Sequence, residues 1–149
     1  MFPVQYLGYR YHIKIGCPIG LIRGESEYIM EILNCNFDRN DKVSVYKLTK
    51  SSSIMVQEAP DGLSVPVDKW ALYNDQKPQK DGTVKDSQVL SFTDTAGVKY
   101  STVSATFIRE FLDIDAIMSP DPYAVILKHG KTKANKSFVT CELDCDYKP

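Results

Sequence analysis

The chain has 149 residues, enough for one domain, and its 43% apolar content is sufficient to bury a core. Its 18 basic and 19 acidic residues nearly balance, which excludes a histone-like protein that binds by overall charge, so attraction to nucleic acid must come from a local patch. No run approaches the roughly 20 apolar residues that span a bilayer and residues 1–18 lack a signal-peptide core, so we expect a cytoplasmic protein with reduced thiols and no membrane association.

The N-terminal part, residues 1–41, differs in pattern from the rest of the chain, and we treat it as an extension or a separate small lobe. Alternating tyrosines and apolar residues over 6–15 predict a strand. Ser26 is a candidate N-cap, and apolar residues at helical spacing up to Leu33 predict a short helix there. A polar linker follows, over residues 34–41.

From Lys42 the pattern turns to β, and we expect residues 42–149 to form the main domain. Val43, Val45 and Tyr46 predict its first strand, and the apolar run over residues 70–73 predicts the next. Residues 74–86 are rich in Lys, Gln, Asp and Gly, which predicts a long mobile loop.

The last third of the chain, residues 89–143, has the clearest pattern. Two apolar runs, 89–92 and 98–103, predict a hairpin over a turn at residues 94–97. An amphipathic helix follows over residues 104–118 and ends before Pro120. Two more strand-like runs, 123–128 and 138–143, close the sequence.

The resulting order, β-β-β-α-β-β, predicts a mostly β protein with one core helix. Such an order is typical of the five-stranded oligonucleotide-binding (OB) barrel, in which a helix lies between the third and fourth strands. The same order is also compatible with another small α+β domain.

Basic residues gather between the last two predicted strands, where residues 128–136 contain four lysines and no acid. Lysines neutralise phosphates, while aromatic rings beside them offer surfaces on which bases stack. Rings such as Phe92, Phe107 and Phe111 have the spacing of core residues, whereas tyrosines tolerate exposure. The candidate nucleic-acid-binding residues are therefore Lys128, Lys131, Lys133, Lys136, Tyr46, Lys47, Tyr73 and Tyr100.

Motifs for catalysis or metal binding are weak, and we expect no catalytic residues, no metal and no cofactor. Neither glycine-rich phosphate loop is present, and His129, among lysines, is expected to be a solvated hairpin residue. Cys141 and Cys145 are spaced too widely on a strand for one zinc ion, unless the strand ends between them and other residues (Cys17, Cys35 and His12) complete the site.

One short pattern leaves a magnesium-dependent nuclease open as a minor alternative. Pro60-Asp61 followed by Asp75 and Lys77 fits a P-D…D-x-K arrangement, in which two acids hold Mg²⁺ and a lysine supports the attacking water. Asp61 reads equally well as part of a turn.

The stretch from Asp94 to Phe107, together with the later lysine turn, resembles small single-stranded-DNA-binding proteins of phages with protein-primed replication. The match covers mainly residues 89–143 and departs from the family pattern at Ala105 and Ala134. The residues that carry it are Gly97, Tyr100, Ser101, Ser104, Thr106, Thr132, Lys133, Asn135 and Phe138. The resemblance implies an OB barrel without catalytic activity.

These observations predict a phage or mobile-element protein that coats and protects exposed single-stranded DNA during replication or recombination. Phage replication proteins are possible further partners, and the protein could assemble into an oligomer. The alternative is a phage-encoded interaction module that inhibits a host defence protein, since the near-neutral charge and the unplaced N-terminal part suit a protein partner equally well.

Overall fold

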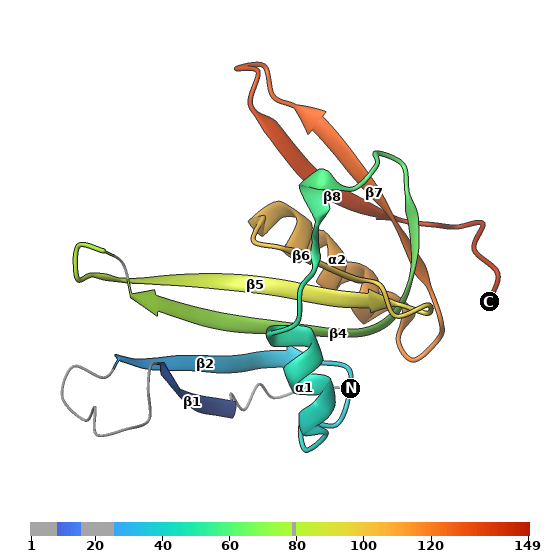
Figure 1. Cartoon of the computed structure of the whole chain (residues 1–149). Coiled ribbons are helices and arrows are strands. Elements are labelled where there is room, and N and C mark those ends of the chain that lie inside the picture. Colours follow the sequence, from blue (N-terminus) through green and yellow to red (C-terminus); the bar gives the residue numbers. More distant parts are fainter. Residues whose placement is uncertain (1–8, 16–25, 79) are drawn as a thin grey trace.

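The computed structural model describes residues 9–15, 26–78 and 80–149, and shows a mostly β protein with two α-helices and a curled, half-barrel sheet (Figure 1). None of the helices within these ranges is long and apolar enough to cross a membrane. The elements in chain order are β1 (Tyr9–Ile15), β2 (Ser26–Cys35), α1 (Lys42–Thr49), β3 (Ile54–Met55), the 3₁₀ turn η1 (Val56–Glu58), β4 (Ser64–Pro78), β5 (Val84–Asp94), β6 (Lys99–Thr102), α2 (Ala105–Met118), β7 (Ala124–Lys131) and β8 (Ser137–Leu143).

Strand β4 is the centre of the sheet. Its first residues, Ser64–Pro66, pair with β7, whereas the part from Val67 onward pairs with β5, and a register shift lies between Val67 and Trp70. Such an irregularity bends a strand and increases its twist, so β4 passes from one part of the curled sheet to the other. The path β1-β2-β4-β5-β6-β3 forms the larger part, and the β7–β8 hairpin branches from β4 and rises away from it (Figure 1).

An aromatic core lies where α2 packs into the curl of the sheet. Ser104 caps α2 by accepting a hydrogen bond from the backbone N–H of Phe107, which starts the helix at the predicted position. Phe107 and Phe111 are fully buried, and each ring lies against Phe92 of β5, with centroids 5.9 and 5.1 Å away. The predicted helix over 104–118, the hairpin over 94–97 and the final pair of strands are thus confirmed.

A helix replaces the strand that was predicted to open the main domain, so that prediction was wrong. Asp41 caps α1 by accepting from the backbone N–H of Ser44, and burial then follows helical spacing, with Val45 and Leu48 facing the sheet. Val43 and Tyr46, which an alternating pattern would have placed in a strand, lie on the exposed side of the helix.

The helix predicted over 26–33 is a strand, β2. Met30 and Ile32 are both buried, and this period of two is that of a strand with one covered face. β2 pairs with β1 on one side and with β4 on the other, so residues 26–35 extend the same sheet that holds the later strands.

The prediction of a mobile loop over residues 74–86 was also wrong, because these residues form a hairpin. β4 and β5 continue as a regular antiparallel ladder from Asn74 opposite Gln88 to Pro78 opposite Val84, and form a long projecting hairpin (Figure 1). Backbone hydrogen bonds hold the two strands together whatever the polarity of their side chains. The polar composition of this segment was therefore a poor guide to its backbone structure.

Candidate nucleic-acid interface

A cavity of about 640 Å³ lies between the β7–β8 hairpin and the segment that joins β6 to α2. Strand β8 does not pair with β6, so the curled sheet stays open along this line. The residues that line the cavity come from η1, the β6–α2 junction and the hairpin: Gln57, Thr102, Val103, Ser104, His129, Gly130, Lys131, Ser137, Phe138 and Val139. We call this cavity the seam groove.

The turn at the tip of the hairpin is well defined and presents the predicted lysines. Thr132 donates its backbone N–H to the carbonyl of Lys136 at 2.9 Å, and Asn135 takes a left-handed conformation, with φ 63°. Asparagine tolerates this conformation better than most residues. The geometry leaves Lys131, Lys133 and Lys136 exposed at or beside the groove.

Lys128 belongs to a different surface from the other lysines. Successive residues of a strand point to opposite faces, so Lys128 lies on the face opposite to that of Lys131 and of the buried Leu127. Its ammonium lies 3.6 Å from the Glu142 carboxylate, which partly offsets its charge. Lys128 therefore does not line the seam groove, contrary to the prediction for the hairpin.

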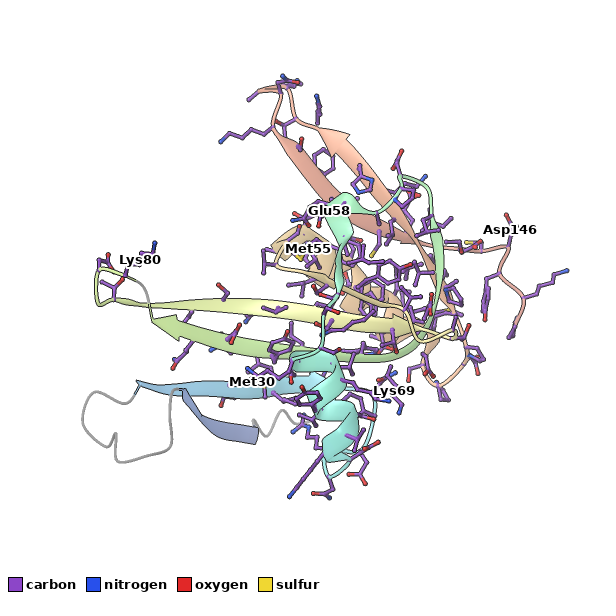
Figure 2. The ribbon with its side chains drawn as sticks, viewed as in Figure 1. Met30, Met55, Glu58, Lys69, Lys80 and Asp146 are labelled. Carbon is purple, nitrogen blue, oxygen red and sulfur yellow. The ribbon has the colours of Figure 1, made fainter. Side chains whose placement is uncertain are left out.

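His129 is held in place rather than solvated, which corrects the expectation from its basic surroundings. Its Nε2 lies 3.0 Å from the Val56 carbonyl of η1, and its Nδ1 lies 3.5 Å from Asp61 Oδ1. The same Asp61 oxygen accepts the backbone N–H of His129 at 2.8 Å, and this bond holds the pKa of the Asp61 carboxyl below its usual range. His129 thus ties the hairpin to η1 (labelled at Glu58 in Figure 2) at one wall of the groove.

Phe138 is an exposed aromatic residue at the rim of the groove that the candidate site omitted, and its pairing with Gly130 places its side chain on the face of the hairpin that carries Lys128, opposite to that of Lys131. It remains 41% exposed and lies opposite Gly130 in the ladder, where a Cβ on residue 130 would come within 2.5 Å of the phenyl ring. Gly130 therefore gives the ring the space it occupies. The sequence carries this signal as Gly130 and Phe138 on either side of the lysine turn, but only the strand register shows that they meet.

Two of the tyrosines proposed to stack on bases are buried, and burial removes them from the interface. The Tyr73 ring is 6% exposed and its hydroxyl lies 3.4 Å from Ser91 Oγ, while Tyr100 stacks on Phe92 at 5.5 Å. Burial raises the pKa of both phenols. Tyr100 belongs to the aromatic core, and Tyr73 belongs to a smaller buried cluster with Met30, Ile32 and Val45.

The remaining two candidates, Tyr46 and Lys47, are exposed on α1 and do not line the seam groove. Tyr46 is 63% exposed. Lys47 contributes instead to a second cavity beside α1. The structure therefore brings together Lys131, Lys133 and Lys136 but separates them from Tyr46 and Lys47.

The arrangement required by the nuclease alternative is not formed. Asp61 precedes the part of β4 that pairs with β7, whereas Asp75 lies beyond the register shift, in the part that pairs with β2 and β5, so the two acids belong to different parts of the curled sheet. Among the described ranges, no three His, Cys, Asp or Glu side chains gather as metal ligands. Cys141 is a buried thiol, and burial beside Glu110 and Glu142 raises its pKa to about 12. Cys17 lies outside the described residues.

Comparisons with known proteins identify no relative. The chain matches no protein-family model, and searches of curated proteins and of solved structures return no significant match.

Proposed function

We propose that the protein binds single-stranded DNA in the seam groove, on an OB-like barrel made of β4, β5, β6, β7 and β8. The connectivity supports this fold: β4 pairs with both β5 and β7, β5 with β6, and β7 with β8, while α2 connects β6 to β7. OB folds bind oligonucleotides on the second and third strands and on the loops after the first and fourth strands. Here these loops are the tips of the β4–β5 and β7–β8 hairpins.

The observation that carries the proposal is an exposed aromatic ring at the rim of the groove, on the same hairpin as the free lysines in and beside its turn. Phe138 offers a face on which a base can stack, and Val103, 55% exposed, adds apolar surface across the groove. Within the described residues, no acid forms an ion pair with Lys131, Lys133 or Lys136. Their charges therefore remain available for phosphates.

This combination favours a strand binder with little sequence preference. Stacking serves every base, because each has a π-face, and lysine–phosphate contacts carry no sequence information. A protein of this kind coats exposed strand during replication or recombination and needs no catalytic group. The resemblance to phage strand-binding proteins, which includes the lysine turn and Phe138, supports the same role.

The direct test compares labelled oligo-dT with duplex of equal length by fluorescence anisotropy at low salt. We expect tighter binding to oligo-dT, and we expect Phe138→Ala to weaken it by about 1–3 kcal/mol. Tyr46→Ala is the matched control, because this exposed ring lies away from the groove and its removal should leave affinity unchanged. Equal preference for duplex, or no binding, would refute the proposal.

A protein partner is the second candidate function, and α1 carries the observation that favours it. Val43 and Tyr46, three residues apart, both remain 63% exposed on one side of this helix and form a small apolar surface. Such a surface suits an inhibitor of a host protein. Stoichiometric, nuclease-resistant capture of one host protein, abolished by Val43→Asp, would support this function in place of DNA binding.

A further inference from the structure

A second cavity, of about 390 Å³, lies between α1 and the end of the sheet where β5 turns into β6. Figure 2 shows Lys69 there, beside α1. Its volume falls within the range of about 300–1,000 Å³ that is usual for small-ligand sites. The lining residues come from α1, the segment after it, β4, β5 and the β5–β6 turn: Ser44, Lys47, Leu48, Ser51, Asp68, Lys69, Thr93, Gly97 and Lys99.

Lys99 is the unusual residue of this cavity, because a lysine is rarely buried without an acid to pair with. It is 8% exposed, and its ammonium donates one hydrogen bond, to the Ser51 carbonyl at 2.7 Å. The described part of the chain provides no further hydrogen-bond partner and no carboxylate within ion-pair distance. Burial lowers the pKa of Lys99 to about 8, so the ammonium form still dominates at neutral pH.

Two more lysines reach the same cavity from other elements. Lys69, on β4, donates to Ser44 Oγ at 3.0 Å and lies 4.0 Å from the Asp41 carboxylate, which holds the lysine side chain alongside α1. Lys47, on α1, is exposed and has no ion-pair partner among the described residues. Of the acids nearby, Asp41 is already engaged as the cap of α1, Asp94 accepts from backbone N–H groups of its own turn, and Asp68 is exposed.

We propose that this cavity binds a phosphate group, of the monoester class, between the ammonium groups of Lys47, Lys69 and Lys99. Three cations against one lining carboxylate give the cavity a positive field, and the N–H groups that Lys99 leaves unused supply charge-assisted hydrogen bonds. The hydroxyl groups of Ser44 and Ser51 lie in the same wall but donate within the chain, to the Asp41 carboxylate and to the Lys47 carbonyl, so the three ammonium groups are the donors that an oxyanion would meet. The site is separate from the seam groove and does not depend on it.

A purely structural role for Lys99, as a cap on the chain after α1, makes a different prediction. A single carbonyl compensates an ammonium poorly, because a buried charge requires pairing to offset its lost hydration. If capping were its whole role, Lys99→Met would change stability alone, and Lys47→Met would change nothing.

The test measures binding of inorganic phosphate by calorimetry at constant ionic strength, with chloride as the reference salt, and follows the Lys99 side chain by NMR. We expect saturable binding with a Kd in the millimolar range or below, and a raised pKa of Lys99 when phosphate is bound, because the anion stabilises the charged form. Lys99→Met and Lys47→Met should each weaken binding by about tenfold or more. Lys148→Met removes the same charge at an exposed position outside both cavities and should leave binding unchanged.

Two further arms identify the source of the phosphate. A 5′-phosphorylated oligo-dT that binds more tightly than its 5′-hydroxyl counterpart, with the difference lost in Lys47→Met, assigns the site to a nucleic-acid end. Ribose 5-phosphate that binds as well as the phosphorylated oligonucleotide assigns it to small phosphorylated molecules. Absence of saturable phosphate binding, or equal weakening by Lys47→Met and Lys148→Met, overturns the proposal, even if the seam groove binds DNA.

Discussion

Replacing Lys131 and Lys133 together by glutamine tests the proposed path of the DNA most directly. Both lysines are exposed and have no acid partner in the described residues, so each is expected to neutralise about one phosphate. For single strands, the slope of log affinity against log salt is about −0.7 per neutralised phosphate, so the double variant should flatten the slope by about 1.4. Between 50 and 200 mM salt, the loss of affinity should then be roughly sevenfold smaller than for the parent protein.

Lys128→Gln provides an internal comparison on the same hairpin. Lys128 lies on the opposite face of β7, and its charge is partly offset by Glu142 at 3.6 Å, so its replacement should change the slope by clearly less than one phosphate equivalent. Anisotropy of labelled oligo-dT at four salt concentrations measures all three slopes, and equal melting temperatures confirm intact folding. An unchanged slope in the double variant would show that the turn is only solvated, and a larger change in Lys128→Gln would place the DNA backbone on the face that Lys128 shares with Phe138.

Three further predictions concern stability and the groove. Asp115 accepts from Trp70 Nε1 at 3.1 Å and from the Tyr123 hydroxyl at 2.9 Å, so Asp115→Ala should cost about 2–4 kcal/mol in urea unfolding, and a cost no larger than that of Asp115→Asn would contradict this. Lys99 has a pKa of about 8 when folded against 10.5 when exposed, so the unfolded chain binds more protons between these values. The free energy of unfolding should rise there with pH by at most about 3 kcal/mol relative to Lys99→Met, and parallel pH profiles of the two proteins would refute it. Gly130→Ala should displace the Phe138 ring, whose nearest atom lies 2.5 Å from the new Cβ. We expect oligo-dT binding to weaken several-fold and the free energy of unfolding to change by less than about 1 kcal/mol. Unchanged affinity would show that the ring does not stack on a base.

The last third of the fold was predictable because its signals are local. Ser104 caps a helix whose apolar residues recur at regular spacing, and Asp94 and Gly97 form a turn in which the aspartate side chain accepts from the backbone N–H groups of Ala96 and Val98. A cap or an aspartate turn is satisfied by residues a few positions away, so the sequence alone suffices to place it. The lysine turn between β7 and β8 is likewise formed by residues close together in the sequence.

The first half was predicted wrongly where tertiary contacts decide the outcome. Residues 26–35 contain helix-forming residues, but the edges of β1 and β4 on either side fix them as a strand. Residues 42–49 contain β-branched residues, but the Asp41 cap and the burial of Val45 and Leu48 against the sheet make them a helix. Local propensity is a weak prior in both cases, and long-range pairing overrides it.

The sequence was sufficient to choose the exposed lysines of the candidate site, but not to decide which aromatic side chains are exposed. Exposed lysines at a turn remain exposed in most folds, so Lys131, Lys133 and Lys136 could be chosen from the sequence. The burial of Tyr73 depends on its register in β4, which turns its ring toward β2 and α1, and the burial of Tyr100 depends on its register in β6, which turns its ring toward Phe92 under α2. The pairing of Phe138 with Gly130 depends on register in the same way.

The two-residue strand β3 has a consequence for how the chain behaves at high concentration. It pairs in parallel with β6 through Ile54 and Met55, and Ser53 and Ser101 share a hydrogen bond of 2.7 Å beside it. An uncovered β6 would present unpaired backbone groups to any other chain, and a very short edge strand is one of the ways in which natural sheets prevent such pairing. β3 thus protects this edge against self-association, while its brevity leaves the adjoining line of the sheet open.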